Sequence, residues 1–192
     1  MQNNLYEFVE IENIDVIKNE LIELGKIKSP KKNKNIFKSD LTNTCPTLYN
    51  FLEKSPSTYT CKFYFTKTND GMMPHIDGHK DLGWGLNIPV INYEDSETLF
   101  YSCDESNMQH SNFDFNTKKS NIKGKMNPYH AQYMYAKDLN KLTIIEKFCM
   151  DKPCIFNTSV MHSMKNYNDM TRIMFLARFH THNSYDEIKE WI

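Results

Sequence analysis

Glycine is scarce in this sequence, and cysteine occurs without a recognisable pattern. Only six glycines stand among the 192 residues, and the phosphate-binding motifs GxGxxG and GxxxxGK[ST] are both missing. The five cysteines form no CxxC pair. This argues against a disulfide framework and against a cysteine-based structural zinc site, and we expect reduced cysteines.

Long apolar runs and an excess of one charge are also missing. No run approaches the roughly 18 residues of a membrane span, and Met1–Glu7 lacks the basic start of a secretory signal. Lysine and arginine number 23 against 24 acids, so the net charge is −1. A surface built for nucleic acid is therefore the less favoured interpretation. We expect a cytoplasmic protein that does not contact a membrane.

The chain changes in character near residue 57. Before it, apolar residues at helical spacing predict a helix over 11–24 that stops at Gly25 and a short helix around 48–52. The basic stretch 26–38 between them is typical of a solvated loop. After it, β-branched and aromatic residues predict strands at 58–66, 73–77, 85–91, 97–102, 131–135, 142–148, 153–157 and 172–179.

This order predicts a mainly β fold, a sandwich or barrel with flanking helices. We expect one domain over 1–192, with a helical flank at 1–57, a β core at 58–180 and a C-terminal helix at 184–192. The polar stretch 104–127 is expected to be an insertion or lid. Ser184 is the expected cap of the final helix.

The most specific local feature is the segment Pro74-His75-Ile76-Asp77-Gly78. Residues i and i+2 of a strand point to the same side, so His75 and Asp77 can present an imidazole and a carboxylate to one point. An HxD pair alone also arises by chance, as a surface histidine before a turn-forming aspartate. The pair therefore indicates a site only in combination with other residues.

A second group of polar residues lies downstream. His162 follows an apolar strand and Arg172 begins the next, so we expect both on one hairpin. Arg172 and Arg178 are separated by an even number of positions and share one strand face, and Ile173, Phe175, Ala177 and Phe179 share the other. Inward-facing arginines need anionic partners, whereas arginines at strand ends in water do not.

Together these residues form the pattern HxD…H…RxxxxxR. Two histidines and one carboxylate, here His75, Asp77 and His162, suit non-heme Fe(II) and leave coordination positions open. A nearby arginine can hold a carboxylate through parallel hydrogen bonds, which a dicarboxylic 2-oxo acid requires at its far end. Zinc accepts the same three ligands, but that interpretation leaves Arg172 without a role.

With these residues, the chain from about Tyr59 to Phe179 resembles the Fe(II)/2-oxoglutarate-dependent dioxygenases. The matches are Pro74-His75-Ile76-Asp77, Leu86-Asn87-Ile88-Pro89-Val90, Phe156-Asn157-Thr158, His162 with Asn166, and Arg172. The pattern is most similar to the prolyl-hydroxylase and aspartyl/asparaginyl-hydroxylase-like branch. Many asparaginyl-hydroxylase relatives lack the acidic ligand that is present here as Asp77. The RxxxxxR spacing is similar to that of the nucleic-acid demethylating branch.

The resemblance implies a double-stranded β-helix, the cupin-like jelly roll, and a hydroxylase that uses Fe(II), O2 and 2-oxoglutarate, with ascorbate as an accessory reductant. It implies that His75, Asp77 and His162 form the catalytic iron site. Arg172 would hold the C5 carboxylate of 2-oxoglutarate, and Arg178 would approach its C1 end or the substrate. The expected substrate is a peptide side chain or a small metabolite. The alternatives are a nucleic-acid oxidative demethylase and a zinc-dependent or non-catalytic jelly-roll protein.

Further residues near these motifs have two interpretations each. Asn87 can bind the cosubstrate or a neighbouring strand, and Tyr64 can offer its hydroxyl to the cosubstrate or pack in the core. Trp84, between two glycines, either lines the substrate site or packs. His79, His180 and His182 are expected in loops rather than among the ligands, and these three histidines are set aside as ligand candidates.

Overall fold

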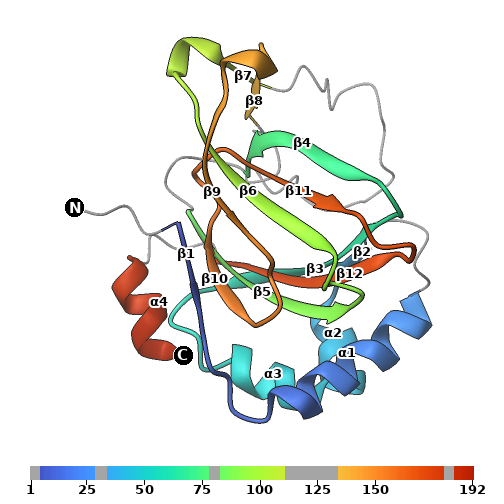
Figure 1. Ribbon diagram of the computed structural model, residues 1–192. Coiled ribbons are helices and arrows are strands. Elements are labelled where there is room, and N and C mark those ends of the chain that lie inside the picture. The colour runs from blue at the N-terminus through green and yellow to red at the C-terminus, as the bar shows by residue number, and fades with distance from the viewer. Residues whose placement is uncertain (1–4, 29–33, 78–82, 111–133, 180–183) are drawn as a thin grey trace, which may run out of the picture.

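Two six-stranded antiparallel sheets face each other in a computed structural model, which describes residues 5–28, 34–77, 83–110, 134–179 and 184–192. One sheet has the strand order β1-β10-β5-β12-β3-β2, and the other has β7-β8-β4-β11-β6-β9. Helices α1, α2 and α3 lie against the outer side of the first sheet (Figure 1). Strands β3 to β6 and β9 to β12 alternate between the sheets. This is the mainly β jelly roll that the sequence predicts.

The bounds of the elements are as follows. The helix-covered sheet contains β1 (Tyr6–Phe8), β2 (Lys34–Ile36), β3 (Tyr59–Thr66), β5 (Trp84–Ile91), β10 (Cys154–Asn157) and β12 (Arg172–Phe179). The second sheet contains β4 (Gly71–Ile76), β6 (Ser96–Ser102), β7 (Met108–His110), β8 (Met134–Ala136), β9 (Thr143–Phe148) and β11 (His162–Asn166). The helices are α1 (Ile14–Lys28), α2 (Lys38–Thr44), α3 (Pro46–Leu52) and α4 (Tyr185–Trp191), with 3-10 turns at Glu105–Asn107 and Leu139–Lys141.

Alternation along β12 separates the core from the cavity. Phe175, Ala177 and Phe179 are buried in the core that also contains the apolar faces of α1 and α3. Each large apolar side chain buried there contributes roughly 1.5–3 kcal/mol. The other face of β12, with Arg172 and Arg178 at its ends, lines a cavity between the sheets. A shift of one residue in the pairing register of β12 would exchange its two faces. The burial of the apolar face in the core therefore fixes the side to which both arginines point.

The N-terminal region differs in two respects from the prediction. Helix α1 runs past Gly25 to Lys28, because glycine in a helix interior costs only about 1 kcal/mol and the buried Leu21 and Leu24 hold this turn against the core. The expected loop over 26–38 is also wrong outside residues 29–33, which lie beyond the described residues. It contains the end of α1, the strand β2 and the start of α2.

The expected hairpin between His162 and Arg172 is wrong as well. His162 begins β11 in the second sheet, whereas Arg172 begins β12 in the helix-covered sheet. The chain therefore crosses from one sheet to the other between them. Strand pairing decides this, since His162 lies opposite His75 of β4 and opposite Phe100 of β6.

The remaining predicted elements agree with the structure within a few residues, but residues 131–133 of the strand expected at 131–135 lie outside the described residues. Helix α4 begins at the expected cap, where the Ser184 Oγ accepts a hydrogen bond from Glu187 N and Glu187 Oε2 accepts one from Ser184 N. Of the predicted insertion over 104–127, the described part is a 3-10 turn followed by β7. None of the described helices has the length and apolar character required to span a bilayer.

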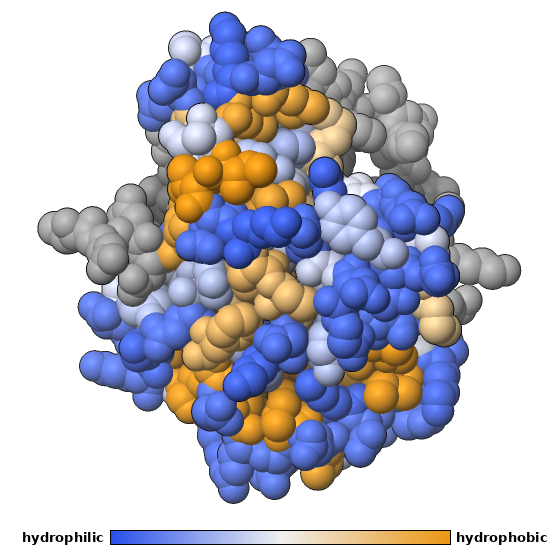
Figure 2. Space-filling view, in the orientation of Figure 1, coloured by the Kyte–Doolittle hydropathy of each residue, from blue (hydrophilic) through white to orange (hydrophobic). Residues whose placement is uncertain are grey.

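One edge of the second sheet is apolar on its surface. Strand β9 is the outermost strand there, and its residues Ile144 and Ile145 are 55% and 49% exposed. Figure 2 shows apolar side chains gathered over the upper part of this strand, whereas the surface around the helices is mainly hydrophilic. Nothing in the site described below depends on this edge.

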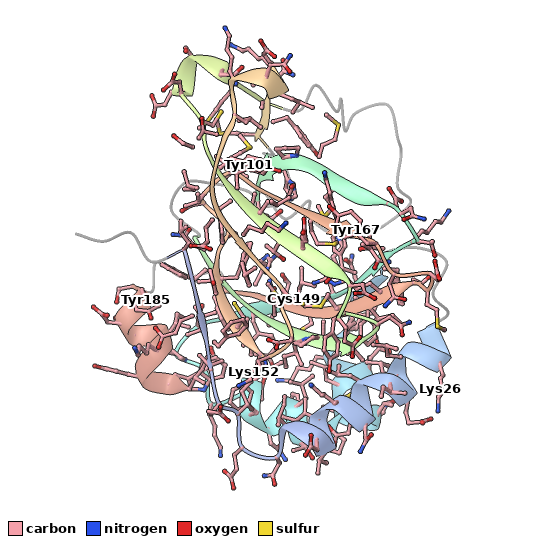
Figure 3. The ribbon with its side chains drawn as sticks, in the orientation of Figure 1. Lys26, Tyr101, Cys149, Lys152, Tyr167 and Tyr185 are labelled. Carbon is pink, nitrogen blue, oxygen red and sulfur yellow. The ribbon has the colours of Figure 1, made fainter. Side chains whose placement is uncertain are left out.

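Asn166 fixes the corner that leads from β11 back to β12. Its side chain is 1% exposed, and its Nδ2 donates to the carbonyl oxygens of Thr66, Lys67 and Met170 at 2.9–3.1 Å. The neighbouring Tyr167, just past the end of β11 in Figure 3, donates its hydroxyl to Glu97. The amide of Asn166 thus ties three backbone segments together.

We predict that Asn166→Asp lowers the free energy of unfolding by about 2–4 kcal/mol, because a carboxylate cannot donate to these buried carbonyls. Urea unfolding measures the change. Asn19→Asp, the same substitution at an exposed position of α1, is the control and should change stability little. Equal stability of the two variants would contradict this role of Asn166.

Candidate metal centre and its cavity

Strand pairing brings two histidines and an aspartate together. His75 lies on β4 and is directly opposite His162 on β11, and the two ring centroids are 4.5 Å apart. Asp77 follows β4 two positions after His75, so both point to the same side. One ligand atom from each of the three residues lies within 4.8 Å of the others. The described residues contain no other group of three or more candidate ligands of this kind.

Backbone carbonyls orient both imidazole rings. The Nδ1 atom of His75 lies 2.7 Å from the carbonyl oxygen of Met73, and that of His162 lies 2.8 Å from the carbonyl oxygen of Val160. A carbonyl oxygen only accepts hydrogen bonds, so Nδ1 carries the proton in each ring. The Nε2 atoms then keep their lone pairs, as metal-binding histidines require.

Burial changes the protonation of His162, one member of the metal-ligand trio of His75, Asp77 and His162. It lowers the pKa of His162 to about 4, and the neighbouring His75 acts in the same direction. His162 is therefore neutral at ordinary pH. Two imidazole Nε2 atoms and an ionised carboxylate are the donor set that a divalent ion such as Fe(II) accepts, so the residues present fit such an ion.

Arg178 holds the carboxylate of Asp77 in place. Its Nε and Nη2 donate to Asp77 Oδ2 at 3.2 and 2.8 Å, which leaves Oδ1 3.2 Å from His75 Nε2. Burial acts to raise the pKa of Asp77, but the charge of Arg178 outweighs it and holds the pKa well below its usual range. The backbone N of Asp77 also donates to Thr158 O.

The Nη1 atom of Arg178, which does not contact Asp77, lies against β5. It donates to Asn87 Oδ1 at 3.0 Å, which is the bond to a neighbouring strand that was one interpretation of Asn87. A Cβ at Gly85 would overlap the Arg178 guanidinium and would lie 2.9 Å from Ala177 O. Glycine is therefore required there. The expected role of Arg178 at the C1 end of a cosubstrate stays a prediction.

Arg172 is buried without a counter-charge. It is 2% exposed, its Nε has no hydrogen-bond partner, and its guanidinium forms no ion pair with any of the residues described. Burial lowers its pKa to about 10, and the thiol of Cys149, labelled in Figure 3, acts in the opposite direction. Arg172 remains charged at neutral pH, so this position favours an anionic ligand.

All of these groups line one cavity of about 710 Å³. The metal-ligand candidates, Arg172, Arg178, Asn87 and Tyr64 border it, together with apolar walls formed by Met150, Phe156, Met174 and Leu176. Trp84 packs against Tyr185, with ring centroids 4.9 Å apart, and does not border the cavity. His79, His180 and His182 lie outside the described residues.

Two residues that matter for the cavity were not singled out from the sequence. Lys62 shares the cavity face of β3 with Tyr64, and Gly85 makes room for Arg178. The period of two along β3 could have identified Lys62, because it lies two positions before Tyr64. No local signal could have identified Gly85, because the side chain for which it makes room, Arg178 on β12, lies 93 positions later in the sequence.

Comparisons with known proteins concern the fold. No family model and no curated protein matches this sequence. The chain is similar to the apo structure of the non-heme monooxygenase ThoJ, with a TM-score of 0.50 and 7% identity, over 92% of this chain and 74% of that one.

Two other solved structures have lower TM-scores. A prolyl-4-hydroxylase of Pseudomonas putida has a TM-score of 0.48 at 7% identity, over 93% of both chains. An oxalate oxidase in complex with the substrate analogue glycolate has a TM-score of 0.36 at 10% identity, and this chain spans 54% of its length. The likeness to ThoJ shows a shared fold, which agrees with the two-sheet jelly roll.

We predict that the metal-free protein loses stability as the pH falls from about 6.5 to about 4. The unfolded chain protonates His162 at its ordinary pKa, whereas the folded protein does so only near 4. In this window the unfolded state binds more protons, so the free energy of unfolding rises with pH, by about 3 kcal/mol over the window. Asp77 lowers the free energy of unfolding further only below roughly pH 4, which is the pKa of an aspartate in the unfolded chain.

Urea unfolding at several pH values across and above this window measures the effect. The slope of the free energy of unfolding against pH gives the number of protons taken up on unfolding, and His162→Gln should lower that number by about one. The difference in slope between this variant and the parent protein isolates the contribution of His162. Identical slopes would show that His162 is not held neutral.

Proposed function

We propose that this protein is an Fe(II)- and 2-oxoglutarate-dependent oxygenase that hydroxylates a peptide side chain or a small metabolite. The observation that carries the proposal is the shared cavity: a metal-ligand trio and a buried guanidinium without a counter-charge border the same space. A metal alone would not require the buried guanidinium of Arg172. A dicarboxylic cosubstrate requires the metal at its 2-oxo acid end and the guanidinium at its far carboxylate.

Each ligand has a defined part in this proposal. His75, His162 and Asp77 would hold the metal through two Nε2 atoms and one carboxylate. Arg172 would bind the far carboxylate of 2-oxoglutarate, which supplies the anion that its burial demands. A ferrous ion held by these three residues would supply the chemistry that activates dioxygen and decarboxylates the 2-oxo acid, with succinate, CO2 and a hydroxylated substrate as the products.

The surrounding residues orient these groups and exclude water. Arg178 fixes one oxygen of Asp77 and leaves the other toward the trio. Carbonyl oxygens hold the protons of both imidazoles on the side away from the site. The apolar side chains of Met174, Met150 and Phe156 wall the cavity, and a low-dielectric wall strengthens the charge interactions inside it.

Asp77→Asn is predicted to lower the affinity for Fe(II) or Mn(II) by more than about 100-fold, since even residues that only orient ligands are worth 10–100-fold. Conversion of 2-oxoglutarate to succinate should be lost, and circular dichroism should show an intact fold. Calorimetric titration of the metal measures the affinity. Asp95→Asn, an exposed aspartate, is the matched control. Wild-type metal affinity in Asp77→Asn would remove Asp77 from the site.

Arg172→Met separates cosubstrate binding from stability. We predict that it weakens 2-oxoglutarate binding roughly tenfold or more while the metal affinity is unchanged. The same variant should raise the free energy of unfolding of the ligand-free protein by about 1–3 kcal/mol, because an apolar side chain replaces a buried charge without a counter-charge.

Titration of 2-oxoglutarate into the Mn(II)-loaded protein and urea unfolding of the ligand-free protein provide the two measurements. Arg172→Lys keeps the charge and is the control for the second. Unchanged 2-oxoglutarate affinity in Arg172→Met would refute the cosubstrate role and, with it, the proposed class of oxygenase.

A further inference from the structure

The cavity contains a second cation whose charge is not matched. Its charged lining residues, among those described, are Lys38, Glu53, Lys62, Asp77, Arg172 and Arg178. Lys38 is paired with Glu53 and Arg178 with Asp77, each at 2.8 Å. These two pairs use both carboxylates. Arg172 and Lys62 are left without an anion among the residues that the structure describes.

The side chain of Lys62 points into the cavity because of its place on β3. Its neighbours Cys61 and Phe63 are buried on the helix side, so Lys62 and Tyr64 face the space between the sheets. The ammonium lies 5.7 Å from the centroid of the Tyr64 ring. Burial lowers the pKa of Lys62, and the charge of Asp77 opposes this from beyond ion-pair distance.

Strand register separates Lys62 from Arg172. Lys62 lies opposite Leu176, and Arg172 lies opposite Thr66, so the two rows are four positions apart along β3. That spacing corresponds to about 13 Å along the strand. Lys62 is only two positions along β3 from Thr60, the residue opposite Arg178, and Arg178 binds the metal-ligand candidate Asp77.

Lys62 also faces the outer part of the cavity. On its other side it is paired with Asn35 of the edge strand β2, which borders the same cavity. The space beside Lys62 therefore lies near Asp77 and toward β2, whereas Arg172 lies at the opposite end of β12. A cosubstrate bound between the trio and Arg172 leaves the Lys62 side for another ligand.

We propose that Lys62 binds an anionic group of the substrate, so that the substrate is a carboxylate- or phosphate-bearing compound. This inference rests on the proposed function, because 2-oxoglutarate uses the charge of Arg172 and leaves that of Lys62. A partly buried ammonium has already lost part of its hydration, and a charge-assisted hydrogen bond to an anion restores it. A neutral substrate would leave this charge uncompensated.

The test is a calorimetric titration of inorganic phosphate and, separately, of acetate into the Mn(II)-loaded protein saturated with 2-oxoglutarate without oxygen. We expect one saturable site, with affinity roughly tenfold or more lower in Lys62→Met. Lys62→Arg should retain the site, since it keeps a cation there. Lys67→Met, an exposed lysine just past β3, makes the same charge change and should bind like the parent protein. Tighter binding of one anion assigns the class.

Three results would overturn the proposal: no saturable site in the parent protein, unchanged affinity in Lys62→Met, or an equal loss of 2-oxoglutarate affinity in that variant. The last would assign Lys62 to the cosubstrate. If 2-oxoglutarate itself does not bind, the proposed function fails separately. Phosphate titration of metal-free Arg172→Met, with and without Lys62→Met, then still decides the role of Lys62.

Discussion

The ion pair between Arg178 and Asp77 joins the two sheets at the point where the candidate metal ligands meet. Arg178 comes from β12 in the helix-covered sheet, and Asp77 follows β4 in the other. Because two donors of the guanidinium use one oxygen of Asp77, the other oxygen is directed toward His75. The geometry of the trio therefore depends on how the two sheets are stacked, and not on one strand alone.

The pair also determines the charge balance of the cavity. Asp77 is satisfied by Arg178, so it is not available to Arg172 or Lys62, and the only other lining carboxylate among the described residues is bound to Lys38. A buried charge without a partner costs free energy that an apolar side chain would not. Such a cost is typical of positions retained for ligand binding, where local rules of stability are broken.

Patterns of period two predicted much of the fold, because they reflect local physics. Along β12 the period of two separated the face with Arg172 and Arg178 from the core face, and the structure has β12 within the predicted bounds. The sheet to which a strand belongs was not predictable in this way. His162 and Arg172 read as one hairpin in the sequence, but His162 pairs with His75, eighty-seven positions earlier, and only that pairing assigns β11 to the second sheet.

The candidate site was also predictable from the sequence only in part. The residue types and spacing of His75, Asp77 and His162 were sufficient to nominate the trio, which the structure brings together. The partner of Arg178 was not predictable, since it depends on the distance between sheets and on the missing side chain of Gly85. The residue type of Lys62 gives no indication of its place, because a lysine in a strand usually faces solvent, and the burial of both its neighbours shows that it faces the cavity.

The distribution of charge within the molecule finally bears on what the cavity selects. The net charge of the chain is −1, so the surface as a whole exerts little attraction on anions. The unmatched cations lie inside the cavity instead, where apolar walls limit screening by water and salt. Their attraction is therefore strongest for a ligand that has entered the cavity. Selection among acidic ligands then follows from the separation between Arg172 and Lys62, since an anion must reach one of these two positions to gain from its charge.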